Sequence, residues 1–163
     1  MTIAFAVIFL CILPLDWRWA ATAMRGRSET FLEMRSAHFD RAFADKTIIA
    51  SDVGFITYFS GGRTCDLAGL VDGREMAAMK PQARIQFCAQ QSPAMMFLTS
   101  GQAKDVEPYI DFNDWMVCGI YDFTNVHSND RHYLLVPKSE AESVCRSLER
   151  TPAPLSAYVP NAA

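Results

Sequence analysis

The first regular pattern in the body of this chain is helical. From Ser28 to Ala44, apolar side chains recur on one side of a helical wheel, and charged or polar residues occupy most of the other side. Ser28 and Glu29 are typical of the first turn of such a helix. We expect an amphipathic helix that docks on a core rather than on a membrane surface, because its polar face carries as many acids as bases.

Short apolar runs that are typical of buried strands follow this helix. The first lies in DKTIIASD, and after Gly54 the segment FITYFS can form one or two helical turns that stop at Gly61 and Gly62. RTCDL then predicts a second strand. Strand, short helix and strand together predict a βαβ-like unit with a parallel pair of strands. We expect Gly61 and Gly62 to occupy backbone positions that need positive φ.

The rest of the pattern completes a small mixed sheet. Two more helices, a third strand, a hairpin and a closing helix are expected at Met76–Lys80 and Ala83–Gln90, Ala94–Thr99, Trp115–Phe123 with His132–Pro137, and Pro137–Leu148. Pro81 separates the first two. The expected fold class is α/β: a small mixed sheet with a short βαβ-like unit, flanking amphipathic helices and a C-terminal hairpin, preceded by an apolar N-terminal helix.

The N-terminal segment Thr2–Leu15 carries no charge, and it is shorter than the roughly 20 apolar residues of a full membrane span. It can be a secretory signal with AATA as its cleavage site, or the end of a membrane helix with Trp17 and Trp19 at headgroup depth. A buried core helix is the third interpretation. We favour the first two, which place the body at or outside a membrane, although Arg18 and its basic neighbours oppose that orientation under the positive-inside rule.

These patterns divide the chain into three parts. Residues 1–24 form a membrane-anchoring or signal segment, residues 25–150 form the soluble α/β domain, and residues 151–163 form a disordered tail rich in proline and alanine. The net charge of −3, without a basic face that contains aromatics, gives no reason to expect a nucleic-acid partner.

Five cysteines are present, and four of them lie outside the apolar segment, at Cys65, Cys88, Cys118 and Cys145. Four cysteines can form two disulfides with three possible pairings in an oxidising compartment. We favour isolated buried thiols, because free cysteine is among the most buried residue types. No pair has a metal-binding spacing, so we predict neither a zinc site nor another cofactor.

Two aspartates lie near predicted strand ends, where α/β folds place ligands. Asp52 and Asp66 can form a general acid/base pair. We favour a structural role, in which Asp52 caps the following helix and Asp66 orients the following loop, because caps are commoner than dyads. The glycines of this stretch lack the spacing of a dinucleotide-binding loop.

Weaker candidates lie elsewhere. His127, Asp130 and His132 can ligate a metal if their connection folds back, but a turn rich in Asn, Ser and Asp has the same composition without a metal. Tyr58 and Phe59 are expected to be core and rim aromatics. No nucleophile–base arrangement can be assembled from these residues.

The stretch from Phe31 to Gly73 resembles the soluble C-terminal region of bacterial type C membrane glycosyltransferases. This class uses lipid-linked sugar donors and includes relatives of the protein mannosyltransferases and of the lipid A aminoarabinose transferase. In the resemblance, one strand ends in a D-x-G-x-x-x-Y-F-S-G-like turn and a second ends in D-L-x-G-L. The matching positions are Asp52, Gly54, Tyr58, Phe59, Ser60 and Gly61, then Asp66, Leu67, Gly69 and Leu70.

The resemblance implies a domain that faces the periplasm at the bacterial inner membrane, with structural or substrate-lining roles for the motif residues. Its expected partners are the membrane and a lipid-linked sugar or a polytopic membrane protein. The class carries its catalytic aspartate in a loop after its first membrane helix, and this chain has at most part of one span. We therefore expect a non-catalytic accessory domain. The alternatives are a secreted binding protein or small hydrolase that uses Asp52 and Asp66, and a cytosolic globular protein.

Overall fold

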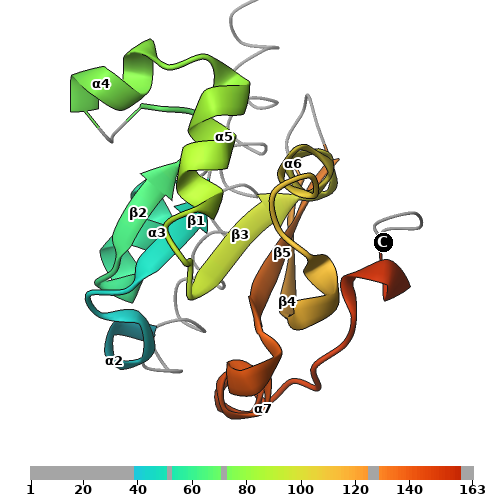
Figure 1. Cartoon of the computed structure of the whole chain (residues 1–163). Coiled ribbons are helices and arrows are strands. Elements are labelled where there is room, and N and C mark those ends of the chain that lie inside the picture. Colours follow the sequence, from blue (N-terminus) through green and yellow to red (C-terminus); the bar gives the residue numbers. More distant parts are fainter. Residues whose placement is uncertain (1–38, 51–52, 71–72, 125–128, 159–163) are drawn as a thin grey trace, which may run out of the picture.

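The centre of the molecule is a five-stranded mixed sheet with helices on both faces (Figure 1). The computed structural model describes residues 39–50, 53–70, 73–124 and 129–158. The strands are β1 (Thr47–Ala50), β2 (Arg63–Asp66), β3 (Met95–Thr99), β4 (Trp115–Thr124) and β5 (Asn129–Pro137), in the spatial order β2-β1-β3-β5-β4. The helices are α2 (Phe39–Phe43), α3 (Val53–Ser60), α4 (Gly73–Ala78), α5 (Pro81–Ala89), α6 (Ser100–Val106) and α7 (Lys138–Ser147), with short 3-10 helices η1 (Phe112–Asp114) and η2 (Leu155–Ala157).

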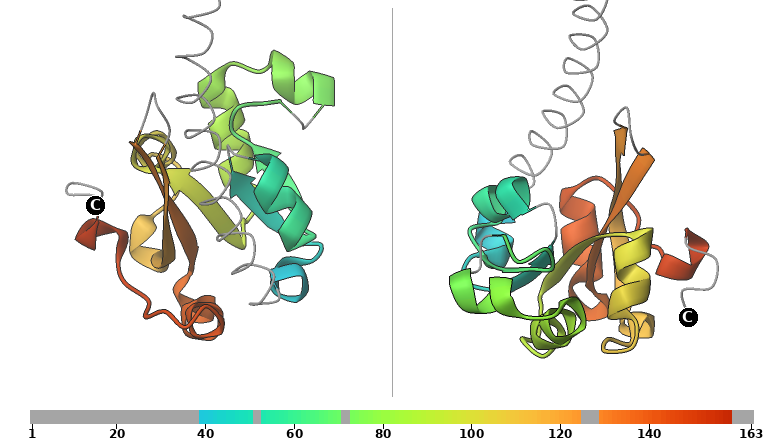
Figure 2. Two further views of the ribbon diagram at one scale, coloured as in Figure 1. Left: turned by 180° about the vertical axis from the view of Figure 1, so that it is seen from behind. Right: turned by 90° about the horizontal axis from the view of Figure 1, so that it is seen from above.

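The strand β1 pairs in parallel with β2 on one side and with β3 on the other. The connection from β1 to β2 therefore moves toward one side of the sheet. The connection from β2 to β3 moves in the opposite direction and passes β1. Because crossovers between parallel strands are right-handed, α3 lies on one face of the sheet and α4 and α5 lie on the other. Strand β5 then adds antiparallel to β3, and β4 adds antiparallel to β5. Figure 2 shows the resulting layers from above.

Two hydrophobic clusters fill the two sides of the sheet. Successive residues of β3 alternate between them: Met95 and Phe97 join the cluster under α2, α3 and α7, while Met96 and Leu98 join the cluster under α5 and α6. These four side chains are at most 1% exposed. A strand that is covered on both faces needs a continuous apolar run rather than an alternating one, and MMFLT has that pattern.

The structure confirms the expected α/β class, the parallel βαβ-like unit and the C-terminal hairpin. The helix before β3 differs in detail. Pro81 separates the two helices and also occupies the first turn of α5. A proline fits this position because the N–H groups of a helix's first turn have no acceptor within the helix. Of the amphipathic helix expected from Ser28, the structure describes only its end, α2, whose Phe39 and Phe43 are fully buried.

The expectation of free buried thiols is wrong. Cys65 is bonded to Cys88, and Cys118 is bonded to Cys145. The first disulfide joins β2 to α5, and the second joins β4 to α7. Each face of the sheet therefore has one helix that is joined to a strand by a disulfide. In both disulfides, a cysteine pairs with the next cysteine along the sequence.

The tail expected to be disordered from Thr151 also needs correction. Ala153 exchanges two backbone hydrogen bonds with Val117 at the outer edge of β4, at 2.7 and 3.2 Å. Leu155 is 2% exposed within the cluster under α5 and α6. The segment through Tyr158 thus packs on the sheet, because it covers an edge strand and buries an apolar side chain. Residues 159–163 lie outside the described part.

Within the described residues, no helix has the length and apolar character required to cross a membrane. The apolar segment Thr2–Leu15 lies outside them.

Candidate functional site

The structure separates the motif residues between opposite edges of the sheet. Gly54, in the first turn of α3, and Asp66 and Gly69 lie at the carboxyl edge, where the parallel strands end. Ser60 and Gly61 lie at the amino edge, where β2 begins. Asp52 lies outside the described residues. The motif residues therefore do not form one site. The buried carboxylate of Asp66 lies at the carboxyl edge.

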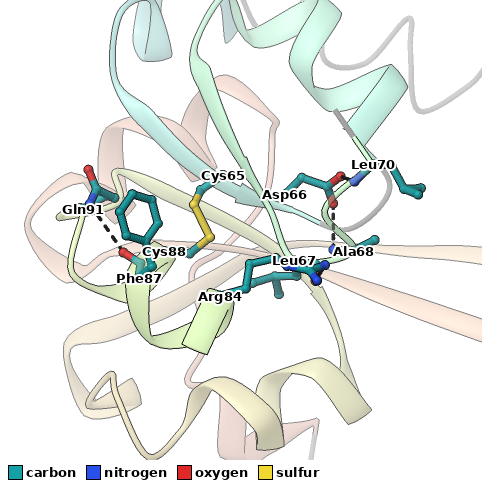
Figure 3. Close-up of a disulfide and its surroundings, with 9 residues drawn as sticks. All are labelled: Cys65, Asp66, Leu67, Ala68, Leu70, Arg84, Phe87, Cys88 and Gln91. Carbon is teal, nitrogen blue, oxygen red and sulfur yellow. Dashed lines mark hydrogen bonds between the residues drawn. A yellow bond between two sulfur atoms is a disulfide. The ribbon is translucent and has the colours of Figure 1, made fainter. Parts of the chain in front are cut away.

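Asp66 is the last residue of β2, and its side chain is fully buried. One carboxylate oxygen accepts the backbone N–H of Ala68 at 2.8 Å, and the other accepts the backbone N–H of Leu70 (Figure 3). The carbonyl of Asp66 also accepts the N–H of Gly69 at 3.0 Å. This residue therefore organises the Asp66 turn, which we define as residues Leu67–Leu70. A buried carboxylate that accepts two backbone N–H groups is placed to hold a loop.

Arg84, which lies on α5, supports this turn. Its side chain is 7% exposed, and its guanidinium donates to the carbonyl of Leu67 at 3.1 Å and to the carbonyl of Met79 at 3.0 Å. Its Nε has no hydrogen-bond partner among the described residues. The two bonds tie the Asp66 turn to the chain that follows α4. The sequence interpretation missed this residue, although its spacing from Ile85 and Cys88 places it on the buried face of α5.

The Cys65–Cys88 disulfide lies beside the same turn. Cys65 directly precedes Asp66, and Cys88 follows Arg84 by one helical turn. The Cys65–Cys88 bond and the hydrogen bond from Arg84 to the carbonyl of Leu67 thus connect α5 to the residues on both sides of Asp66. Figure 3 shows Arg84 and the disulfide beside the turn. This arrangement gives the turn a fixed conformation.

Gly69 is required by the turn for two reasons. Its φ is +74°, and a Cβ atom built on it would lie 2.4 Å from an Arg84 guanidinium nitrogen. We expect Gly69→Ala to lower the free energy of unfolding by about 3 kcal/mol, since it adds backbone strain and displaces a buried, hydrogen-bonded guanidinium. Gly73→Ala is the matched control, because Gly73 has φ +86° with no atom near its Cβ position. It should cost only the strain, about 1 kcal/mol. Urea denaturation of both variants would measure this, and equal losses would contradict a role for Arg84.

At the amino edge, Gly61 and Gly62 follow the end of α3, and each is needed for a different reason. Gly61 has φ +61°, as expected, but Gly62 has no positive φ. A Cβ on Gly62 would lie 2.8 Å from the carbonyl oxygen of Lys46 and 2.9 Å from that of Phe43. Gly62 is therefore needed for close backbone approach, and its N–H donates to the Ser60 hydroxyl at 3.2 Å. Ser60 is 2% exposed, so its role is to end the helix.

Tyr58 does not belong to the core or its rim, because its side chain is 78% exposed on α3. The prediction of a core aromatic at this position is wrong. Helical spacing instead turns Ile56 inward, where it is 1% exposed. The side chain of Phe59 is not described.

Of the metal candidates, only His132 has a described side chain. His132 is 6% exposed and stacks on Phe97 with ring centroids 5.0 Å apart. His127 and the Asp130 side chain lie outside the described part. Among the residues that the structure does describe, no three His, Cys, Asp or Glu side chains are grouped so that they could hold a metal ion.

The carboxyl edge can therefore hold and present the loop that Asp66 and Arg84 fix. A comparison with family models matches residues 19–145 to a domain of unknown function (DUF8728). No curated protein matches the chain. No solved structure matches it either. Since the matched residues make up well over half of the sequence, the chain belongs to the DUF8728 family.

Proposed function

We propose that this chain is a non-catalytic, extracytoplasmic accessory domain tethered to the bacterial inner membrane by its apolar N-terminal segment. It resembles the soluble domain of a lipid-linked sugar transferase, and it covers or shapes a substrate site contributed by membrane helices. The observation that carries this proposal is the state of Asp66, whose buried carboxylate is engaged by the backbone N–H groups of Ala68 and Leu70. A general acid or base must reach a substrate proton, and this carboxylate is turned into its own loop.

The two disulfides support the extracytoplasmic location. Both are structural, since each joins a strand to a helix that packs on it. Structural disulfides form and persist in oxidising compartments such as the periplasm, and they are rare in the cytosol. The same observation argues against the cytosolic alternative.

The location is tested by alkylating intact cells before lysis and then separating the membrane fraction. We expect the chain in the membrane fraction, with Cys65, Cys88, Cys118 and Cys145 protected from alkylation until a reductant is added. N-terminal sequencing should find Met1 retained. A mature chain that begins near Ala23 and is recovered in the soluble fraction would instead favour the secreted binding protein.

The absence of catalysis is tested with the purified full chain in lipid vesicles. We expect neither glycosyl transfer from a polyprenyl-phosphate sugar nor hydrolysis of that donor. Activity that is present in the wild type and lost in a folded Asp66→Asn variant would overturn the proposal and support the hydrolase that uses Asp52 and Asp66. The fold of the variant is checked by circular dichroism before its activity is compared.

A further inference from the structure

The outer edge of β4 pairs with the C-terminal segment at a single bridge. In the described part of the chain, β4 is the last strand of the sheet on this side. The segment after α7 passes beside it (Figure 1), and Ala153 pairs with Val117 in antiparallel direction. Pro152 and Pro154 flank Ala153, and a proline has no N–H group to offer a further strand. A further strand at this edge therefore has its place beyond the bridge, along residues 119–124 of β4.

The C-terminal segment cannot follow this later part of β4, because it comes from the end of α7. The N–H of Arg150 still donates to the carbonyl of Cys145 at 2.9 Å, and Glu149 has a φ of +55°. The segment therefore meets β4 only after Arg150. At the same place β4 has a bulge, since its pairing with β5 shifts between Val117 and Gly119.

A cavity of about 250 Å³ lies where the C-terminal segment and the bulge meet, and we call it the edge slot. It is lined by residues 117–120 of β4 and by Arg150, Thr151 and Tyr158. On the α7 side of the sheet, the guanidinium of Arg150 lies over the ring of Tyr121, 5.6 Å from its centroid. On the other side, the ring of Tyr158 lies 6.2 Å from that of Tyr133. The edge slot is thus bounded from both faces of the sheet, with the β4 backbone between them.

The size and charge of the edge slot indicate that it fits the end of a chain. Its volume is below the roughly 300–1,000 Å³ of small-molecule sites, so it suits one or two residues rather than a whole ligand. Arg150 is exposed, and it is the only charged residue among those that line the slot. A guanidinium binds a carboxylate through two parallel hydrogen bonds. These features together match the C-terminal carboxylate of a peptide.

We propose that residues 119–124 of β4 bind an extended peptide from a partner protein, whose C-terminal carboxylate is bound by Arg150 in the edge slot. Addition of a strand to a sheet edge and capture of a terminal carboxylate are both established modes of peptide recognition. A strand that adds antiparallel to β4 runs in the direction of the C-terminal segment, so its C-terminus reaches the slot beside the Val117–Ala153 bridge. A parallel strand would instead bring its N-terminal ammonium group to Arg150, which like charge disfavours. This inference goes beyond the proposed function and does not depend on the membrane tether.

The test uses the full chain, immobilised in detergent, and a mixture of random hexapeptides with free C-terminal carboxylates. We expect the chain to retain about tenfold less of the same mixture with C-terminal amides, because a charged partner of the guanidinium is lost. Arg150→Gln should reduce retention of the carboxylate mixture by a similar factor. Arg146→Gln is the matched control, because Arg146 is exposed on α7 and pairs there with Glu142. It should retain as much as the wild type, and circular dichroism checks the fold of both variants.

Hydrogen exchange locates the bound peptides. The backbone amides of residues 119–124 should exchange more slowly in the presence of the carboxylate mixture, and those of β2, the strand at the opposite edge of the sheet, should be unchanged. Equal retention of amidated and carboxylate peptides would overturn the capture of a C-terminus, and acidic side chains would then be the bound group. Slower exchange at β2 alone, or retention by the wild type no higher than that by Arg150→Gln, would overturn the site on β4.

Discussion

Replacement of Asp66 with alanine should lower the free energy of unfolding by about 3 kcal/mol, because it removes a charged acceptor from two backbone N–H groups in a buried turn. Those groups belong to Ala68 and Leu70, and the Asp66 side chain that binds them is fully buried. Asp66→Asn should also be destabilising, since an amide has one acceptor oxygen and its NH₂ group would face a second N–H donor. Chemical denaturation of both variants would measure these losses.

Asp111→Ala provides the control for this prediction. Asp111 also accepts a backbone N–H, that of Asn113 at 2.9 Å, but this bond is exposed at the start of η1. An exposed cap of this kind contributes about 1 kcal/mol. If Asp66→Ala costs no more than Asp111→Ala, the Asp66 carboxylate does not hold the turn, and a chemical role for it would have to be considered again.

Removal of the Cys118–Cys145 bridge should have a comparable effect. The two cysteines are 27 residues apart in sequence, and closing a loop of this size stabilises a fold by about 3.5 kcal/mol in the chain-entropy model. We expect the double variant Cys118→Ala/Cys145→Ala to unfold at a correspondingly lower denaturant concentration. Alanine is preferred to serine because both positions are at most 1% exposed and a buried hydroxyl would need a partner.

Cys11→Ala is the matched control, because Cys11 lies in the apolar segment and belongs to neither bridge. Its unfolding midpoint should equal that of the wild type. Addition of a reductant should shift the wild type toward the double variant. A double variant as stable as the wild type would show that this bridge does not constrain the unfolded chain.

Much of the fold could be predicted from local patterns. TIIA, RTCD and MMFLT are short runs bounded by turn residues, and each forms a strand. The long hairpin was predicted because two apolar runs flank a polar connection rich in turn residues. Such patterns are sufficient where a segment's own periodicity fixes which of its side chains must be buried.

The candidate site could be predicted only in part. The position of Asp66 at a strand end followed from the sequence, and its structural role was the favoured hypothesis. The turn that it holds is also bound by Arg84, which is 18 residues later and reaches the carbonyl of Leu67 only after α5 packs on the sheet. The exposure of Tyr58 likewise depends on which face of α3 meets the sheet.

By itself, the sequence determined the α/β class, the order of the main elements and the glycines at their ends, because these follow from local periodicity and turn chemistry. Only the tertiary structure decided three other features: the pairing of the four cysteines, the packing of Ala153 and Leu155 on the sheet, and the hydrogen bond from Arg84 to the Asp66 turn. Each depends on which distant segments become neighbours, and three pairings of four cysteines are equally compatible with one sequence. The aspartate that a strand-end pattern marks as a candidate acid is, in three dimensions, the residue that holds Leu70 in place.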